Sequence, residues 1–157
     1  MPDFGLSWIS MLRGSYPAKV DDKGRLKLPA DFRSKIEEEY GSKFFITSSL
    51  EIDSVHLYPL PVWEDIERKL TDQPMTNTSV DKFLNITGYY GAEVSMDNQG
   101  RILIPQRLRD AVQLRDEVNV MGKMRFLSIW NDENYKKKLS NQPFGKDDAH
   151  ELSQRGI

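Results

Sequence analysis

A ten-residue motif occurs twice in this chain of 157 residues. The first copy reads "VDDKGRLKLP" at residues 20–29, and the second reads "MDNQGRILIP" at residues 96–105. A single offset of 76 residues aligns Asp21 with Asp97 and Arg25 with Arg101. Agreement in identity and in polarity at one fixed offset indicates an internal duplication. The duplication constrains the fold, because both copies are expected to adopt the same local structure.

Each copy begins with the pattern of a β-hairpin. Short strands are expected at 18–21 and 92–96, and each is followed by a glycine that can adopt the positive φ of a tight turn. The next strand alternates apolar and polar residues, so that Arg25 and Lys27 face outward in the first copy. In the second copy Leu103 replaces the outward lysine, which makes that outer face partly apolar.

A helix, a further hairpin and a closing helix complete each copy. A proline ends the second strand and can start the short helix that follows it. The closing helices are amphipathic. The aromatic residues in and near them are expected to belong to the core or to a subunit interface rather than to stack on bases, namely Tyr58, Trp63, Trp130 and Tyr135. The helices are predicted at 30–40 and 106–114, the hairpins at 43–47 with 54–59 and at 117–122 with 125–130, and the closing helices at 61–70 and 133–139.

These elements define two repeats, each too small to fold alone. Roughly fifty residues with short strands do not bury a sufficient core. Strands shared between the copies would solve this problem and would also remove exposed sheet edges. We therefore expect an α+β fold in which the repeats form one small barrel with pseudo-two-fold symmetry, flanked by short helices. The predicted organisation is a first repeat at 11–70, a polar linker at 71–82, a second repeat at 83–139 and a polar C-terminal tail at 140–157.

Composition excludes several classes of protein. The chain has no cysteine, which excludes disulfides and thiolate metal sites. Its two histidines lack the spacing of metal ligands, and no phosphate-binding loop is present, so no metal or cofactor is expected. No apolar run approaches the roughly 20 residues of a membrane span. Because the first residues do not resemble a signal peptide, a cytoplasmic protein is expected.

An enzyme is a weaker alternative. Asp21 with Asp97, or Glu51 with Asp53, could be imagined as the carboxylate pair of a glycoside hydrolase. No nucleophile motif accompanies either pair. The sequence therefore favours a protein without catalytic activity.

Charge is distributed unevenly along the chain. The net charge of −2 does not by itself indicate a nucleic-acid-binding protein. Residues 11–35, however, carry a net charge of +4, whereas acidic residues collect in "IEEEY", "WEDIE" and "KDDAHE". Such separation can produce one basic face on a nearly neutral protein.

Three stretches resemble the MraZ family of bacterial transcription regulators: "MLRGSYPAKVDDKGRLKLPADFR", "LYPLPVWEDIERKL" and "MDNQGRILIPQRLRDAV". The duplicated Asp-x-x-x-Arg unit is similar to the paired SpoVT-AbrB domains of that family, and the similarity extends from about Met11 to about Leu139. Family members usually begin near Met11, so residues 1–10 are expected to be an N-terminal extension or the product of an upstream start.

The resemblance implies both a fold and a function. The fold would be a barrel of swapped AbrB-like hairpins, and the protein would form ring-shaped homo-oligomers. The ring would bind short direct repeats in double-stranded DNA upstream of its own gene, at the head of the division and cell-wall gene cluster. The protein would thus regulate transcription and associate with the nucleoid.

The resemblance also implies which residues contact DNA. The motif arginines are the expected contacts, with the motif aspartates as their partners: Arg25 with Asp21, and Arg101 with Asp97. An arginine fork can grip phosphate oxygens or a guanine edge with two hydrogen bonds. Further basic residues are expected to add attraction to phosphate. These flanking residues are Lys23, Arg13, Lys27 and Arg33.

Two alternatives remain open at this point. The Asp–Arg pairs could be ion pairs that only brace the hairpins. The copies also differ, since Gln99 and Leu103 replace Lys23 and Lys27, and we hypothesise that the first copy carries more of the DNA affinity. Alternatively, the protein could be an antitoxin-like interaction module of AbrB fold, in which the tail wraps a partner protein.

Overall fold

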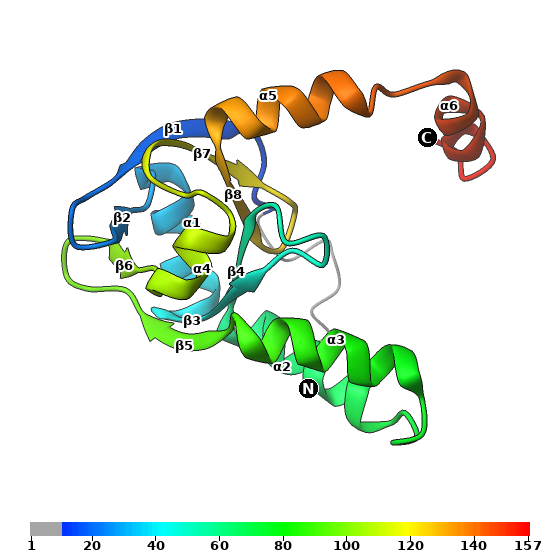
Figure 1. Ribbon diagram of the computed structural model, residues 1–157, viewed down its shortest axis with the longest axis horizontal. Helices are drawn as coiled ribbons and strands as arrows, with labels where there is room; N and C mark the ends of the chain where they lie inside the picture. The colour runs from blue at the N-terminus through cyan, green and yellow to red at the C-terminus, as the bar shows by residue number, and fades with distance from the viewer. Residues whose placement is uncertain (1–10) are drawn as a thin grey trace.

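The computed structural model describes residues 11–157, so the extension predicted at residues 1–10 lies outside the described part. Eight strands and six helices occupy this part, and most begin and end close to the predicted limits (Figure 1). The order is β1 (Ser15–Val20), β2 (Arg25–Lys27), α1 (Ala30–Tyr40), β3 (Lys43–Ser48), β4 (Val55–Pro59), α2 (Leu60–Thr71), α3 (Thr78–Tyr89), β5 (Ala92–Ser95), β6 (Arg101–Leu103), α4 (Gln106–Ala111), β7 (Asp116–Gly122), β8 (Leu127–Asn131), α5 (Asp132–Asn141) and α6 (Lys146–Ser153).

The strands form one antiparallel sheet that curves into a nearly closed barrel. Their order is β5-β3-β4-β8-β7-β1-β2-β6. β5 and β6, at the two ends of this order, are joined by a hydrogen bond of 2.9 Å from the Asp97 N–H to the Arg101 carbonyl. A barrel formed in this way leaves little exposed sheet edge, as expected for short strands.

The two repeats exchange strands. β1 of the first repeat pairs with β7 of the second, and β5 of the second pairs with β3 of the first. β2 pairs with β6 around the facing residues Leu26 and Ile102, and β4 pairs with β8 around His56 and Ser128. Because these central pairs join equivalent strands, they lie on the pseudo-two-fold axis. The swapped-hairpin barrel expected from the sequence is therefore confirmed.

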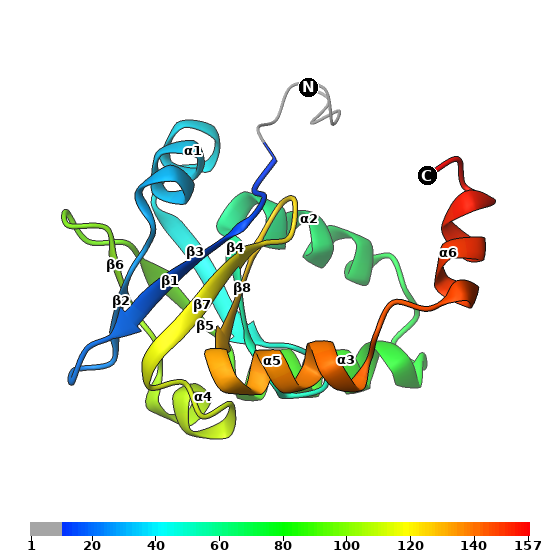
Figure 2. The ribbon, with the colours of Figure 1, turned by 90° about the horizontal axis from the view of Figure 1, so that it is seen from above.

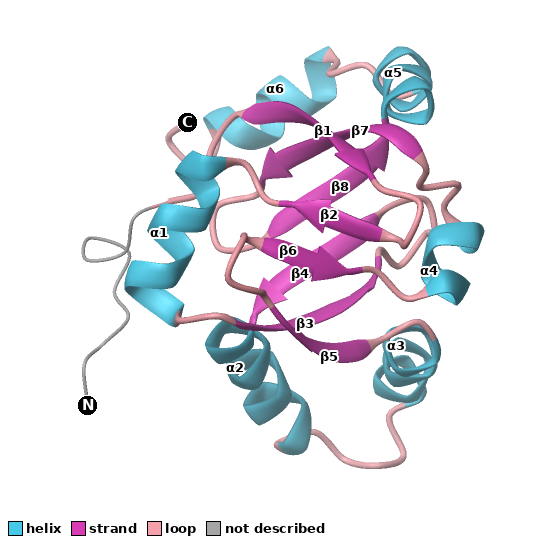
Figure 3. Cartoon of the chain, turned by 90° about the vertical axis from the view of Figure 1, so that its left-hand side faces the viewer, coloured by secondary structure: helices cyan, strands magenta, loops and turns pink. Residues whose placement is uncertain are grey.

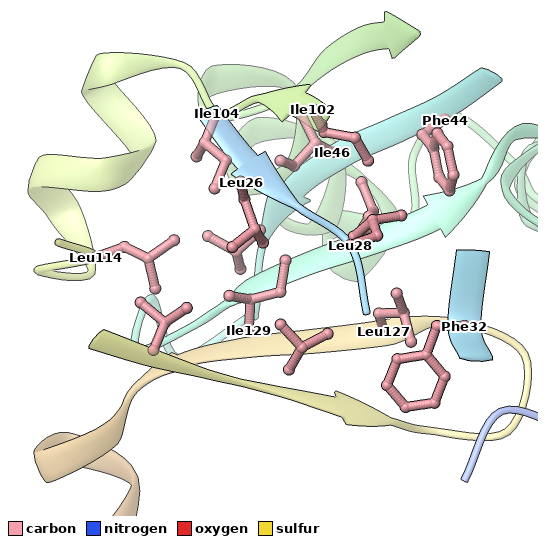
Figure 4. Close-up of a cluster of buried hydrophobic side chains, with 14 of the residues drawn as sticks. Leu26, Leu28, Phe32, Phe44, Ile46, Ile102, Ile104, Leu114, Leu127 and Ile129 are labelled. Atoms are coloured by element: carbon pink, nitrogen blue, oxygen red, sulfur yellow. The ribbon is translucent and has the colours of Figure 1, made fainter. Parts of the chain in front are cut away.

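The core contains equivalent residues from both repeats. Leu26 and Ile102 are each 1 % exposed, and both point into the barrel together with Leu28 and Ile104 (Figure 4). The helices α1 and α4 add Phe32 and Leu108, and the longer strands add Phe44, Ile46, Val118, Val120, Leu127 and Ile129. Burial of these side chains from both repeats is the main force that stabilises the unit, since neither repeat contains enough of them alone.

Helices surround the barrel at different places. α1 and α4 flank β2 and β6 on opposite sides (Figure 3), whereas α2 and α3 pack beside β3 and β4. Trp63 of α2 is 4 % exposed and stacks on Phe45 of β3, with 4.4 Å between ring centroids. Trp130, which precedes α5, is 5 % exposed. The prediction that these aromatic residues are buried is confirmed for both tryptophans.

Two segments contain more helix than the sequence suggested. The second part of the predicted linker belongs to α3, which begins at Thr78 because the Asn77 side chain accepts hydrogen bonds from the backbone N–H groups of Ser79 and Val80. The tail predicted at 140–157 contains α6, where the Asp148 carboxylate accepts a hydrogen bond from the Gly145 N–H. α6 lies away from the barrel, on the side opposite to β2 and β6 (Figure 1).

The described residues, 11–157, contain neither a membrane-spanning helix nor a cluster of potential metal ligands. No helix there is both long and apolar enough to cross a membrane. No cluster of three or more histidine or acidic side chains suited to a metal ion occurs in the same range.

The shared core yields a first prediction. Phe44 is fully buried, so Phe44→Ala is expected to lower the free energy of unfolding by about 3–5 kcal/mol. Phe144→Ala is the matched control, because Phe144 is 69 % exposed and a surface substitution changes stability by only about 0.5 kcal/mol. Urea denaturation of both variants measures the difference. Similar losses in the two variants would contradict the assignment of Phe44 to the shared core.

Candidate nucleic-acid interface

The aspartate of each motif organises the turn that follows it. In the first repeat, Asp21 Oδ1 accepts hydrogen bonds from the backbone N–H groups of Lys23 and Arg25, at 3.0 and 2.8 Å. Asp21 Oδ2 accepts a third from Arg25 Nε, at 3.1 Å. Gly24 completes the turn with φ of 81°, a conformation that glycine adopts without steric cost. A short aspartate side chain is suited to such a turn because it can reach the N–H groups two and four residues ahead.

The second repeat has the same hydrogen bonds. Asp97 Oδ1 accepts from the N–H groups of Gln99 and Arg101 at 2.9 and 2.8 Å, and Asp97 Oδ2 accepts from Arg101 Nε at 2.9 Å. Gly100 has φ of 77°. The spacing of four residues between Asp and Arg is therefore the spacing that lets one carboxylate bind both the backbone and the side chain of the arginine.

These bonds lower the pKa of both aspartates. The backbone N–H of Arg25 makes the largest contribution to the lowered pKa of Asp21, and its side chain adds to it. Arg101 acts on the pKa of Asp97 in the same way. Both carboxyl groups are consequently ionised near neutral pH, which keeps each ion pair intact.

Antiparallel pairing of β2 with β6 brings the two motif arginines onto one surface. Arg25 faces Leu103 across the strands, and Lys27 faces Arg101. Leu26 and Ile102 point inward, so these four side chains point outward by strand alternation. Diagonal neighbours in such a pair are about 7–8 Å apart, which is the expected separation of Arg25 and Arg101. We call this outward surface, formed by Arg25, Lys27, Arg101 and Leu103, the β2–β6 ribbon.

The ion pairs leave part of each arginine available. Within residues 11–157, the hydrogen bonds of the Arg25 and Arg101 side chains involve Nε alone. The terminal nitrogens of both guanidinium groups are thus free to donate to a ligand. A carboxylate that binds the Nε edge also restricts the orientation of the fork, so bracing and ligand binding are compatible roles for the same residue.

Lys23 and Lys27 also lie at this side of the barrel. Lys23 is at the exposed tip of the β1–β2 turn, and Lys27 is exposed on the β2–β6 ribbon. Both turns project from the barrel on the same side (Figure 2). In the second repeat the equivalent positions are Gln99 and Leu103, and Leu103 is 54 % exposed. The positive charge of the surface is therefore unequal between the repeats.

The structure does not place the other two candidate residues in the same way. Arg13 lies at the far end of β1, next to the bridge between Leu12 and Met124, and is remote from the turn that begins at Asp21. Arg33 contacts the turn of the second repeat, since its Nη2 donates to the Asn98 carbonyl at 3.0 Å. Its Nε also donates to Glu37 at 2.7 Å.

Arg109 was not among the candidates identified from the sequence. It is the equivalent of Arg33 at the offset of 76 residues, and its guanidinium lies against Gly24 of the first repeat. The repeat alignment contains this equivalence, but a linear sequence does not show that the helix of one repeat contacts the turn of the other.

Three of the four carboxylates considered for an enzymatic role are engaged in ion pairs. Asp21 and Asp97 bind their motif arginines. Burial opposes ionisation of Asp53, yet hydrogen bonds from Ser49 and Lys138 outweigh it and hold the pKa of Asp53 below its ordinary value. A general acid needs a raised pKa, so the geometry does not favour a role for these three carboxyl groups in acid catalysis.

Comparisons with known proteins agree with the duplicated pattern. The family model described as "MraZ protein, putative antitoxin-like" matches residues 11–86 and 91–155. A protein of Acidobacterium capsulatum named transcriptional regulator MraZ is 44 % identical over 147 residues, which cover 94 % of this chain and 100 % of that protein. A protein of the same name from Koribacter versatilis is 42 % identical over 147 residues, with the same coverage of both chains. Another, from Caldicellulosiruptor saccharolyticus, is 36 % identical over 148 residues, again covering 94 % and 100 %.

The hydrogen bonds of the turns predict how the aspartates titrate. The pKa of Asp97 should lie below the ordinary value of about 3.9, and Arg101→Ala should raise it only in part, because the backbone N–H of residue 101 still donates to the carboxylate. A folded-state pKa below the unfolded value means that the stabilisation is complete above about pH 4 and is lost as pH falls through the lower, folded-state pKa. Carboxyl carbon NMR shifts measure both values.

Asp21 provides the internal control in the same variant. Its own arginine is intact in Arg101→Ala, so its titration should not change. A return of the Asp97 pKa to the ordinary value would show that the arginine side chain, and not the backbone N–H, dominates the shift.

Proposed function

Because the chain belongs to the MraZ family, we propose that it is a transcriptional regulator that binds double-stranded DNA through the β2–β6 ribbon. The observation that carries this proposal is the presence of Arg25 and Arg101 on one two-stranded surface, each with its terminal nitrogens free among the described residues. The named relatives, which are called transcriptional regulators, support the same function.

The shape of the surface supports this role. The major groove of B-DNA is about 12 Å wide and admits a two-stranded β-ribbon. Two arginines about 7–8 Å apart on such a ribbon fit within that width. Each free guanidinium edge can bind a guanine or a phosphate with two hydrogen bonds, whereas Lys23 at the turn tip and Lys27 on the ribbon contribute attraction to phosphates.

Arg13 and Arg33 have different places in this proposal. Arg13 is outside the ribbon and would contact DNA only where the duplex extends along β1. Arg33 is engaged by Glu37 and by the Asn98 carbonyl, so its main contribution is to the turn of the second repeat. The direct contacts are therefore assigned to Arg25, Arg101, Lys23 and Lys27.

Assembly into a ring would compensate for the small size of one surface. The chain has a net charge of −2, and a single ribbon presents few basic groups to DNA. Several ribbons held in one homo-oligomer would raise the effective concentration for neighbouring DNA repeats and so increase the overall affinity. We propose that the protein acts in this form on short direct repeats upstream of its own gene, within the division and cell-wall cluster, and associates with the nucleoid.

Arginine variants test the DNA-binding proposal. Arg25→Ala and Arg101→Ala should each weaken binding to DNA from the region upstream of the gene by roughly tenfold, and Arg25→Ala should have the larger effect because Lys23 and Lys27 act beside it. Gel shifts at two salt concentrations measure affinity and salt dependence. Arg68→Ala is the matched control, because Arg68 pairs with Asp65 on α2, outside the ribbon.

Two results would contradict parts of this proposal. Equal losses in the two well-folded arginine variants would exclude the inequality between repeats. Unchanged affinity in both variants would exclude the β2–β6 ribbon as the DNA-binding surface.

A second candidate function comes from the description of the family as antitoxin-like. In this alternative, the tail that contains α6 would bind a partner protein. α6 has mostly exposed residues and extends away from the barrel, so it is accessible for such a contact. The two candidates assign the main interaction to opposite sides of the molecule.

Removal of residues 140–157 distinguishes these candidates. A regulator that uses the β2–β6 ribbon should keep its DNA affinity within about twofold, with the same steep salt dependence, because α6 lies on the opposite side. A gel shift of the truncated and full-length proteins measures this. Loss of DNA binding in a truncated protein with an unchanged circular dichroism spectrum would assign the interaction to the tail.

A further inference from the structure

The topology places the helix of each repeat beside the turn of the other. β2 and β6 are antiparallel, so the end of β2 lies next to the start of β6. The Leu28 N–H accordingly donates to the Gly100 carbonyl at 2.9 Å, and the Ile104 N–H donates to the Gly24 carbonyl at 2.9 Å. α1 begins directly after β2, and its first turn therefore lies at the turn of the second repeat.

Arg33 of α1 contacts that turn closely. Its Nη2 donates to the Asn98 carbonyl at 3.0 Å. A methyl group built on Gly100 would lie 2.8 Å from Arg33 Cδ and 2.9 Å from Arg33 Nη1. The arginine side chain thus occupies the space beside the glycine and holds the backbone from outside. Glu37 orients it through a bond of 2.7 Å to Nε.

Arg109 of α4 also packs against the turn of the opposite repeat, here the first, although its hydrogen bond goes to Ile104 of its own repeat. A methyl group on Gly24 would lie 2.5 Å from Arg109 Cζ and 2.7 Å from Arg109 Nε. Arg109 Nε donates to the Ile104 carbonyl at 2.9 Å. The N–H of the same Ile104 donates to the Gly24 carbonyl, so Arg109 binds the residue that is itself bonded to the turn. Gly24 and Gly100 are therefore required for two reasons, namely their positive φ and the arginine packed against them.

We infer that Arg33 and Arg109 are positioning residues, each of which holds the turn of the opposite repeat and thereby orients the motif arginine of that turn. Arg33 acts on Arg101, and Arg109 acts on Arg25. This inference rests on the proposed function, because orientation of the motif arginines affects affinity only if they contact DNA.

The short strands explain why such a support is needed. β2 and β6 have three residues each, so the strand pairing adds few backbone bonds to those that the motif aspartates make within the turns. A contact with a base or a phosphate requires a side chain held in a defined orientation by its surroundings. Arginine is suited to this support because its guanidinium can lie beside a glycine and donate in a fixed direction, as Arg33 does to the Asn98 carbonyl.

Double-mutant cycles test the crossed arrangement. Arg33→Ala should weaken DNA binding by about threefold or more in the native protein and by much less when Arg101 is already alanine, because the two losses then concern one contact. In a protein that already carries Arg25→Ala, Arg33→Ala should weaken DNA binding by the same factor as in the native protein, within about twofold. Arg109→Ala should show the reverse, with coupling to Arg25 and independence from Arg101. Equal coupling to both motif arginines, or to neither, would overturn the inference.

Conservative variants separate positioning from direct contact. If Arg33 only positions the turn, Arg33→Lys should weaken binding nearly as much as Arg33→Ala and should leave the salt dependence unchanged, because lysine keeps the charge but lacks the fork. A direct phosphate contact would give near-native affinity in Arg33→Lys, and in Arg33→Ala the slope of log affinity against log salt would become shallower by about one. The second pattern would overturn the inference for this residue. The same comparison applies to Arg109.

The protein without DNA provides an independent measurement. Backbone amide NMR shifts should change at residues 98–101 in Arg33→Lys and at residues 22–25 in Arg109→Lys. Lys35→Ala is the control, because Lys35 is on α1 but makes no hydrogen bond to either turn among the described residues. If the NMR shifts change in the opposite repeat but the native protein does not bind DNA, the proposed function is refuted and the bracing is retained. If the shifts change only in the repeat that carries the substitution, the bracing itself is refuted.

Discussion

The pairing of β2 with β6 is the interaction on which the other features of the molecule depend. Each strand has three residues, yet their antiparallel contact around Leu26 and Ile102 places the two repeats on a common pseudo-two-fold axis. The same contact buries both apolar side chains and directs the charged neighbours outward. Without it, the shared core would lose the contact between Leu26 and Ile102, and the two motif arginines would lie on separate surfaces.

The Asp-x-x-x-Arg motif combines structural bracing with the presentation of a cation. The carboxylate of Asp21 organises the turn through two backbone N–H groups and orients Arg25 through Nε. The terminal nitrogens remain free within the described residues. An ion pair that only stabilised the hairpin would not need the arginine fork, because a lysine could neutralise the same carboxylate. The geometry therefore favours a motif in which structural bracing serves the presentation of a cation.

Local patterns predicted most of the elements, but not which residues meet in space. Alternating residues, turn glycines and strand-ending prolines predicted β2, α1, β6 and the later hairpins. The repeat predicted a barrel that shares strands between its copies, and the family resemblance implied the swapped hairpins. The helix α3 was not predicted, because its start depends on the Asn77 cap within a polar stretch that was assigned to the linker.

Proximity along the chain was a poor guide to the candidate site. Arg13 and Arg33 were grouped with Arg25 because they are near it in sequence. A straight β1 carries Arg13 to the opposite end of the strand, and the antiparallel pairing takes Arg33 to the turn of the other repeat. The register of β2 with β6, which no local pattern encodes, decides both the composition of the ribbon and the role of Arg109.

The differences between the repeats bear on the kind of DNA sequence that such a unit would recognise. A surface with true two-fold symmetry favours a palindromic site, because both halves make the same contacts. Here the ribbon has Lys27 on one side and Leu103 on the other, and the turn tips carry Lys23 and Gln99. The brace differs as well, since Arg33 pairs with Glu37, whereas the position equivalent in sequence in the second repeat is Gln113, which has no charge. An unequal surface distinguishes the two directions of the duplex, so copies arranged in the same direction around an oligomer would favour direct repeats over inverted ones.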